Sequence, residues 1–268
     1  MLDLREGDSI GQYVLERTID RGAFGRVWRA LDTVSGKTVA IKVLAGDANA
    51  EHVKARADLE RLAAAAARDS SHIVRVLAGG HDPVPHIIME FVDGTNLRDE
   101  LADRGPLPQE EVIRIALQVA DALRALHRVR VVHRDVKPAN ILLDQQGEVR
   151  LTDFGIAKIL GYDETVTLTQ QNLLSAPYAA PEVWEGAPNP QSDLYAFGAV
   201  VFEMLAGRGP FQGDLMDLFR RHRTEEPDLA LLPAHLAPSL HEMVYLCLRK
   251  STDERPQSAE ACIRLLER

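Results

Sequence analysis

The stretch HRDVKPAN at residues 133–140, followed by DFG at residues 153–155, is the most informative part of this 268-residue chain. Within 23 residues, counted as 155 − 133 + 1, it supplies two carboxylates, a lysine and an asparagine amide. Carboxylate and amide oxygens suit a hard cation such as Mg²⁺. A lysine beside a carboxylate can stabilise a phosphoryl group during transfer. The stretch therefore indicates phosphoryl transfer from a magnesium-bound nucleotide to a hydroxyl group.

Length and composition are those of an ordinary globular chain. A length of 268 residues suits one large domain or two packed lobes, and 46% hydrophobic residues can fill a sizeable core. The formal net charge of −9 argues against nucleic-acid binding, which needs a surplus of Lys and Arg. Lysine supplies six of the 31 basic residues, and this arginine bias favours a bacterial chain.

The cysteines and the chain start favour a soluble protein. Cys247 and Cys262 are far apart in the sequence and have apolar neighbours, so we expect buried free thiols in a reducing compartment. The charged N-terminus lacks the apolar core of a signal peptide, and the longest apolar run, residues 194–202, is too short to span a bilayer. We expect a cytoplasmic chain. The alternative that it is the cytoplasmic domain of a larger, membrane-anchored protein stays open.

The first third of the chain favours strands. Five short β-branched or alternating runs are separated by glycines and a proline. An Ala- and Leu-rich segment, residues 51–68, is the one strong helix former among them. We predict a small antiparallel sheet with one main helix, forming an N-terminal lobe at residues 1–93. The predicted strands are residues 13–15, 26–31, 38–43, 73–77 and 86–92.

After Gly94 the pattern becomes helical. Apolar residues repeat at three- and four-residue steps up to about His127, in a segment that begins with Pro108 and acidic residues. Residues 192–206 are apolar almost all round and precede Gly207, a C-cap residue, so we expect a buried central helix. Residues 240–248 and 258–266 predict further helices. We therefore predict an α+β fold with two lobes, the second one larger, mostly helical and spanning residues 94–268.

The order HRDxKxxN and then DFG resembles the catalytic loop and metal-binding segment of protein kinases. A lysine two residues after the catalytic Asp resembles the Ser/Thr kinases in particular. The resemblance covers residues 13–266 and implies a bilobal, eukaryotic-like Ser/Thr protein kinase that uses ATP and Mg²⁺, with Mn²⁺ as an alternative. It implies that Asp135 is the base, that Lys137 neutralises the phosphoryl group, and that Asn140 and Asp153 bind the metal.

The same resemblance assigns a nucleotide site. VAIK at residues 39–42 resembles the strand whose Lys grips the phosphates, and MEFV at residues 89–92 resembles the hinge that binds adenine. The glycine-rich loop keeps two of three glycines, with Asp20 in place of the first. The carboxylate expected to pair with that Lys is Glu60, with Glu51 as the second choice. The implied ATP-binding residues are Gly22, Gly25, Val27, Ala40, Lys42, Glu60, Met89, Glu90 and Val92.

Three residues have implied structural roles. APE at residues 180–182 resembles the segment that closes the activation loop, and Arg255 stands where the family keeps an arginine that pairs with Glu182. Asp193 matches the residue that braces the catalytic loop.

Control of the site is implied by Arg134, which in the family often binds an activation-loop phosphate. We hypothesise that one or more of three threonines in that loop, Thr165, Thr167 and Thr169, is autophosphorylated. The rival hypothesis is that Asp163 and Glu164 already supply the negative charge. Ser175, grouped with these regulatory residues, stands where the family usually has a Thr that contacts Asp135 and Lys137.

The implied partners are protein substrates with Ser or Thr acceptors, with no nucleic acid and no membrane segment in this chain. A transient homodimer for autophosphorylation stays open. One alternative function is a pseudokinase or scaffold. Three departures from the family pattern motivate it: Asp20 stands in place of a glycine, Glu60 is displaced by about one residue against the family spacing, and Leu174 replaces the glycine that usually precedes the loop Thr. Another is a small-molecule phosphotransferase of related fold.

Overall fold

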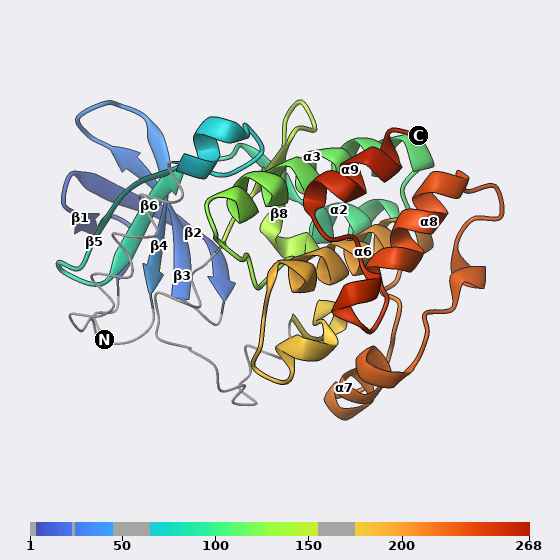
Figure 1. The fold of residues 1–268 in the computed structure, drawn as a ribbon. Helices are drawn as coiled ribbons and strands as arrows, with labels where there is room; N and C mark the ends of the chain where they lie inside the picture. Colours follow the sequence, from blue (N-terminus) through green and yellow to red (C-terminus); the bar gives the residue numbers. More distant parts are fainter. Residues whose placement is uncertain (1–3, 23–24, 45–64, 155–174) are drawn as a thin grey trace.

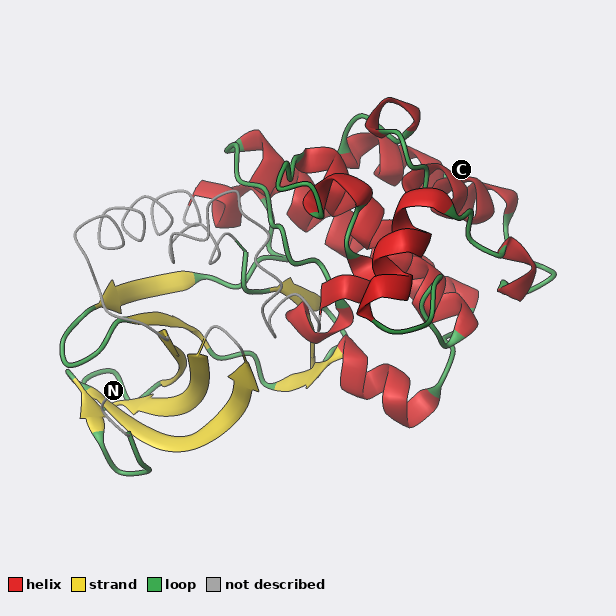
Figure 2. Ribbon diagram, turned by 90° about the horizontal axis from the view of Figure 1, so that it is seen from below, coloured by secondary structure: helices red, strands yellow, loops and turns green. Residues whose placement is uncertain are grey.

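The computed structural model describes residues 4–22, 25–44, 65–154 and 175–268. A curled β-sheet occupies one side of the molecule and a larger group of helices the other (Figure 1). Figure 2, seen from below, separates the yellow strands from the red helices in the same way. The mixed α+β class that the sequence predicts is confirmed.

The N-terminal sheet has six antiparallel strands in the order β1-β2-β3-β4-β6-β5. The first of them was not predicted. The predicted strand at residues 73–77 begins three residues late, because Ile73 instead makes an isolated parallel bridge to Leu151. The strands are β1 (Ser9–Ile10), β2 (Tyr13–Gly22), β3 (Gly25–Asp32), β4 (Thr38–Leu44), β5 (Val76–Gly80) and β6 (His86–Glu90).

The two faces of this sheet pack against different cores. Trp28, Ile41 and Ile88 form a small apolar cluster with other buried residues of the strands. Ala40 and Met89, whose side chains alternate with those of Ile41 and Ile88, belong to the large core shared with the helices. This second face of β4 therefore faces the helical side of the molecule. Lys42 lies two residues after Ala40, so its side chain is on this same face.

A second, three-stranded sheet contains the residues between the HRDVKPAN stretch and the DFG stretch. β7 (Gly94–Asn96), β8 (Ile141–Asp144) and β9 (Val149–Leu151) are antiparallel, with β8 in the middle. A short 3-10 turn, η1 (Pro138–Asn140), leads directly into β8. Residues 135–140 are therefore held next to a hydrogen-bonded ladder.

Each helix that the sequence predicts after Gly94 is present among the described residues. Predicted boundaries agree within two residues, and Gly207 ends the central helix at φ 70° as expected. Two helices, α2 and α7, were not predicted. Of the predicted helix at residues 51–68, the structure describes only the end, where residues 65–69 are helical. The helices are α2 (Leu97–Arg104), α3 (Gln109–Arg128), α6 (Pro190–Ala206), α7 (Leu215–Thr224), α8 (Pro238–Cys247) and α9 (Ala259–Leu266).

Helix α6 is the buried axis of the helical side, with α3 and α8 packed against it (Figure 1). It begins with a capping box, in which Asn189 and Ser192 exchange side-chain and backbone hydrogen bonds. Its apolar residues are buried all round, and so is Asp193 in its first turn, with 1% exposure. A charged group in that position requires partners, and the catalytic loop supplies them.

The Glu182–Arg255 ion pair joins two distant segments, as predicted. Arg255 donates to both carboxylate oxygens of Glu182, at 2.7 and 2.9 Å. Its remaining N–H groups donate to the carbonyls of Arg249, Lys250 and Gln191, so all five donors are used. Burial would raise the pKa of Glu182, but hydrogen bonds from Arg255 and Ser192 lower it overall.

The two cysteines are free and buried, as predicted, although they are not far apart in space. The Sγ atoms of Cys247 on α8 and Cys262 on α9 are 3.8 Å apart. Burial and the neighbouring sulfur raise the pKa of Cys247. Both thiols therefore pack as small apolar side chains in the contact between these helices.

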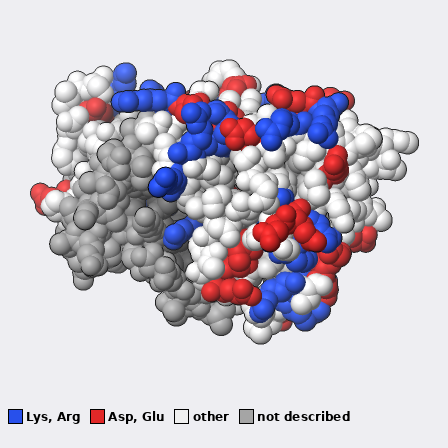
Figure 3. All heavy atoms as spheres, in the orientation of Figure 1, with Lys and Arg blue, Asp and Glu red and all other residues white. Residues whose placement is uncertain are grey.

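The surface carries both signs of charge. On the face drawn in Figure 3, Lys and Arg side chains lie among Asp and Glu side chains, and neither sign covers a continuous area. In the part of the chain that the structure describes, no helix is both long enough and apolar enough to cross a bilayer.

Replacing Arg255 with alanine should lower the free energy of unfolding by about 3–5 kcal/mol, because Glu182 would stay buried without its partner. Chemical denaturation at neutral pH measures this loss. The matched control is Arg104→Ala, since Arg104 makes exposed ion pairs on α2. The control should cost about 0–1 kcal/mol.

The pH dependence provides a second check. The pKa of Glu182 is depressed in the folded protein, so its pairing stabilises the fold above the ordinary pKa of 4.5 and is lost as the pH falls further. The stability difference between wild type and Arg255→Ala should therefore shrink in acid. A difference that stays constant or grows below that pH would contradict this account of the pair.

Candidate active site

The catalytic loop is anchored by one buried carboxylate. Asp193 accepts the backbone N–H groups of His133 and Arg134, at 2.8 and 2.9 Å. Its Oδ2 atom also lies 2.7 Å from Nε2 of His127, at the end of α3. Arg134 has φ 70°, a left-handed conformation that is costly for a non-glycine residue. The two hydrogen bonds from the loop amides to Asp193 hold the loop in that conformation.

His133 connects the catalytic loop to the segment that contains Asp153. It is 1% exposed, and burial is the main reason that its pKa lies below the ordinary value. Nδ1 accepts the N–H of Asp135 at 3.3 Å, and Nε2 lies 3.0 Å from the Thr152 carbonyl. A neutral ring can satisfy both contacts, with its proton on Nε2. The ring also meets Phe154 edge-on at 6.3 Å.

Three side chains surround the carboxylate of Asp135. Ser175 donates to Oδ1 at 2.6 Å, while Asn140 and Lys137 reach Oδ2 at 2.9 and 2.8 Å. Lys137 also donates to the Ser175 hydroxyl at 3.0 Å. The Asp135 side chain keeps 18% exposure, so the carboxylate is held firmly and is still accessible.

Lys42 and Asp153 form a second charged pair. Nζ of Lys42 lies 2.7 Å from Oδ2 of Asp153, and the lysine side chain is 5% exposed. Asp153 has φ 66°, so a second non-glycine residue of this site adopts the left-handed conformation. Glu60, the partner predicted for Lys42, lies outside the described residues.

The glycine-rich loop is described at its two ends. β2 ends at Gly22 and β3 begins at Gly25, and the two residues pair with each other. Gly25 has φ 136°, and a Cβ atom there would lie 1.8 Å from the Val43 carbonyl oxygen. No other residue fits without moving β4. Asp20 lies opposite Val27 in the same hairpin.

The segment between the sheets is held by a clamp on Glu90. Arg75 binds the Glu90 carboxylate through its backbone N–H and its side chain, at 3.0 and 2.8 Å. The Glu90 amide donates back to the Arg75 carbonyl at 2.9 Å. Met89 is buried, and Val92 packs against the large core. The Glu90 amide is therefore already paired and is not available to a nucleotide.

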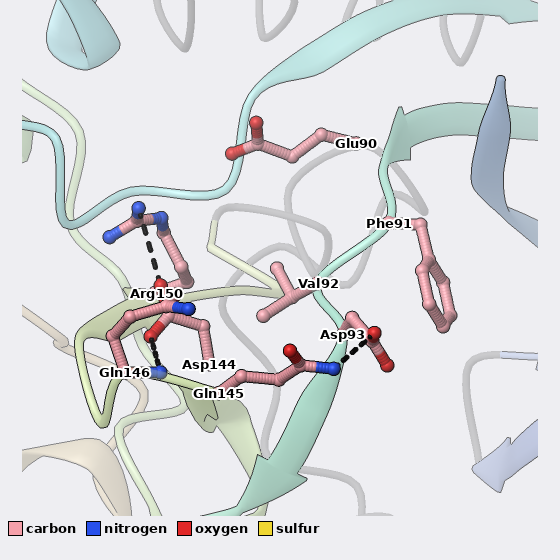
Figure 4. A pocket seen from close by; sticks show the side chains of 8 residues that line it. All are labelled: Glu90, Phe91, Val92, Asp93, Asp144, Gln145, Gln146 and Arg150. Carbon is pink, nitrogen blue, oxygen red and sulfur yellow. Dashed lines mark hydrogen bonds and ion pairs between the residues drawn. The ribbon is translucent and has the colours of Figure 1, made fainter.

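A polar pocket of about 240 Å³ lies beside this segment. It is bounded by residues 90–93 and by the turn between β8 and β9 (Figure 4). Gln145 donates to Asp93 at 2.6 Å, and Arg150 lies 3.5 Å from Asp144. Phe91 points to the other side in the figure. None of the catalytic-loop residues lines this pocket, so its contacts restrain residues 90–93 without contributing to the charged site.

The comparisons with known proteins agree with this geometry. The protein kinase domain family matches residues 13–264. A probable serine/threonine-protein kinase of Streptomyces coelicolor is 36% identical over 261 residues, which cover 93% of this chain. The chain belongs to the eukaryotic-like Ser/Thr protein kinase family.

Other members of this kinase family are similarly close. The serine/threonine-protein kinase PrkC of Bacillus subtilis is 33% identical over 93% of this chain. The crystal structure of the Mycobacterium tuberculosis PknI kinase domain matches with a TM-score of 0.75 and 28% identity, over 98% of each chain. This kinase domain spans 38% of the Streptomyces relative's length and 39% of PrkC.

The predicted site residues fall into three groups. The structure brings Asp135, Lys137, Asn140 and Ser175 into one cluster and joins Lys42 to Asp153. Val27, Ala40, Met89 and Val92 all pack on the large core beside them. Thr165, Thr167 and Thr169 lie outside the described residues. Within the described chain, Arg134 has no ion-pair partner.

Sequence reasoning assigned no role to His127 or His133. Both contact the catalytic loop or its anchor, and His133 stands inside the very motif that was quoted. Its place in the pattern could have drawn attention to it. The contact of His127 with Asp193 joins residues 66 positions apart, and no local signal indicates it.

Replacing Asp193 with alanine should lower the free energy of unfolding by about 2–4 kcal/mol, because two loop amides would lose their acceptor in a buried place. Asp193→Asn keeps one acceptor oxygen and should cost less. Urea denaturation of both variants measures the difference. Asp103→Ala, at an exposed position of α2, is the control and should stay within about 0.5 kcal/mol of wild type. A loss below 1 kcal/mol for Asp193→Ala would exclude the anchoring role.

Proposed function

We propose that this kinase domain transfers the γ-phosphoryl group of ATP to Ser and Thr hydroxyls of proteins, with Asp135 as the residue that orients the acceptor. The observation that carries the proposal is the Asp135 cluster, with Ser175 at 2.6 Å and Lys137 at 2.8 Å from its carboxylate. Phosphoryl transfer depends on positioning and charge more than on covalent chemistry by the protein. A fixed, accessible carboxylate beside an ammonium group meets that need.

The two oxygens of Asp135 have different tasks in this proposal. Oδ2 already accepts from Asn140 and Lys137, which use its lone pairs. Oδ1 accepts from Ser175 and, within the described residues, has capacity for one more donor. The acceptor hydroxyl would donate to Oδ1, which then receives its proton as the oxygen attacks phosphorus.

Two lysines supply positive charge at opposite ends of the site. Lys137 would neutralise the phosphoryl group during transfer, because its Nζ lies between Asp135 and Ser175. Lys42 would hold the remaining phosphates of the nucleotide. Its ammonium is a compact charge on a flexible stem, and so it can exchange Asp153 for a phosphate oxygen without leaving the site.

The donor atoms near Asp153 fit a magnesium ion. Asn140 donates through Nδ2 to Asp135, which leaves its carbonyl oxygen available as a ligand. Asp153 keeps Oδ1 outside its contact with Lys42. Both are hard oxygen ligands of the kind that Mg²⁺ prefers, and Mn²⁺ accepts them too. When bound, Mg²⁺–ATP supplies the phosphoryl group and neutralises charge on its oxygens.

Arg134 supports control by phosphorylation. Its guanidinium has no acidic partner among the described residues, although it adjoins the catalytic Asp135. A phosphate on the activation loop would provide a bidentate partner for this guanidinium. We propose Thr165, Thr167 or Thr169 as the acceptor. Ser175 itself is a poor acceptor, since a phosphate there would face the Asp135 carboxylate.

Asp135→Asn and Lys42→Ala should each reduce phosphorylation of a generic protein acceptor by about 10²–10⁴-fold, because each removes a group required for positioning or charge. Radiolabelled ATP with dephosphorylated casein measures the rate. Lys37→Ala, at an exposed position before β4, is the matched lysine control and should retain full activity.

Full activity in either site variant would refute the assignment of these residues. Wild-type protein that binds ATP without transferring phosphate to any acceptor would instead favour a pseudokinase. Transfer to small molecules and not to proteins would favour the related phosphotransferases.

Phosphosite mapping tests the regulatory proposal. After incubation with Mg²⁺ and ATP, mass spectrometry should find phosphate on at least one of Thr165, Thr167 and Thr169 in an active sample. None on an active sample would exclude the proposal. Adding catalytic amounts of wild type to the Asp135→Asn variant tests the transient homodimer, because only transfer between copies can modify the inactive chain.

A further inference from the structure

A buried polar network lies outside the charged site, between α6 and α7. His222 on α7 is fully buried, although it is a titratable residue on a short helix of mostly polar residues. Its Nδ1 lies 2.9 Å from the hydroxyl of Tyr195 on α6. Lys250, just after α8, donates to the same hydroxyl at 3.2 Å. Three elements therefore meet at one phenol oxygen.

Lys250 sits in an aromatic cage. Its Nζ lies 4.5 Å from the centre of the Phe211 ring and 5.5 Å from that of Tyr195. Burial lowers the pKa of Lys250 to about 8, so it is still mostly charged at neutral pH. As a cation it can only donate, and the phenol oxygen of Tyr195 accepts. The phenol proton is then available for Nδ1 of His222.

The imidazole of His222 is neutral, and with its own proton on Nε2 it accepts the phenol proton at Nδ1; the backbone carbonyl of His222, at 3.5 Å, is a second and longer acceptor for the same hydroxyl. Burial first, and the charge of Lys250 second, lower the pKa of His222 to about 3. The backbone of Pro177 acts in the opposite direction and raises this pKa, so a polar group of that residue lies beside the ring. Nε2 is buried and makes no hydrogen bond of standard geometry with the described residues.

Pro177 belongs to the segment that begins at Ser175. The 3-10 turn η2 (Ala176–Tyr178) follows Ser175 directly and contacts both α6 and α7. Ala176 packs in a small cluster with Phe211 and Leu218, and Phe211 meets the His222 ring edge-on at 4.8 Å. At the other end of the turn, Tyr178 donates to Glu203 of α6 at 2.7 Å. The turn is thus clamped between two helices.

We propose that His222 is a positioning residue for the protein acceptor, acting through η2 on the place of Ser175 beside Asp135. This inference rests on the proposed kinase function. Ser175 is one residue away from the turn, and its hydroxyl contacts both Asp135 and Lys137. If η2 moved relative to α7, the Ser175 hydroxyl would move with it, and so would the adjoining surface that would bind the protein acceptor. Among the residues that the structure describes, the side-chain contacts of His222, Tyr195 and Lys250 do not include residues 89–92.

The test compares substitutions that keep or remove single features of the ring. His222→Phe keeps the edge-on contact with Phe211 and removes the ring acceptor for Tyr195, which leaves the longer contact of 3.5 Å to the backbone carbonyl at position 222. His222→Asn keeps a polar atom close to the place of Nδ1. Tyr195→Phe removes the hydroxyl and leaves His222 unchanged. For each variant, KM for dephosphorylated casein and KM for ATP are measured separately, together with Tm.

His222→Phe and Tyr195→Phe should raise KM for casein about threefold to tenfold, the size expected from one lost buried hydrogen bond. KM for ATP should change less than about twofold, and His222→Asn should recover most of the loss. His241→Phe, at an exposed position of α8, is the matched control and should behave as wild type.

Two results would overturn the inference. One is an unchanged KM for casein in both His222→Phe and Tyr195→Phe. The other is a parallel loss for casein and ATP that follows Tm and that His222→Asn does not recover, because this indicates a structural role alone. A wild-type protein without any protein phosphorylation would be a different outcome, since it would refute the proposed function itself.

Discussion

The contact between Asp193 and the two amides of His133 and Arg134 is the constraint on which the site depends. A carboxylate with 1% exposure is stable only when its oxygens are fully paired, and here its partners are backbone groups of the catalytic loop. The loop in turn needs this anchor, because Arg134 has a left-handed backbone. Neither part is favourable without the other, so the central helix and the catalytic loop form one unit.

Other polar side chains along helix α6 hold further segments of the chain in the same way. At its start, Ser192 donates to Glu182, which is also held by Arg255. Two residues after Asp193, the hydroxyl of Tyr195 accepts from Lys250 and donates to His222, and two turns later Glu203 accepts from Tyr178. The apolar residues of α6 bury the helix, while its few polar ones each hold a different loop. The helix therefore determines where the loops lie relative to one another.

Much of this arrangement could be predicted where the signal is local. The HRDxKxxN and DFG pattern gave the residues of the charged site, the period of residues 108–127 gave α3, and Gly207 gave the end of α6. Helix α7 was missed because its sequence, LMDLFRRHRT, is mostly polar and its burial comes from partners distant in the chain. The pairing of Lys42 with Asp153 was missed for the same reason, as it joins residues 111 positions apart, counted as 153 − 42.

Two buried histidines share a physical requirement that no local pattern indicates. His133 accepts the amide of Asp135 at Nδ1 and lies beside the Thr152 carbonyl at Nε2, and His222 accepts the phenol of Tyr195 at Nδ1 while its Nε2 is buried. Both rings accept a hydrogen bond at Nδ1, which only a neutral ring can do, and His133 also donates to the Thr152 carbonyl from Nε2. Burial lowers the pKa of both. Burial makes a charged imidazole unfavourable and so keeps both rings neutral. A neutral ring can accept a hydrogen bond, and this is how His133 holds the amide of Asp135 and how His222 on α7 holds the hydroxyl of Tyr195 on α6.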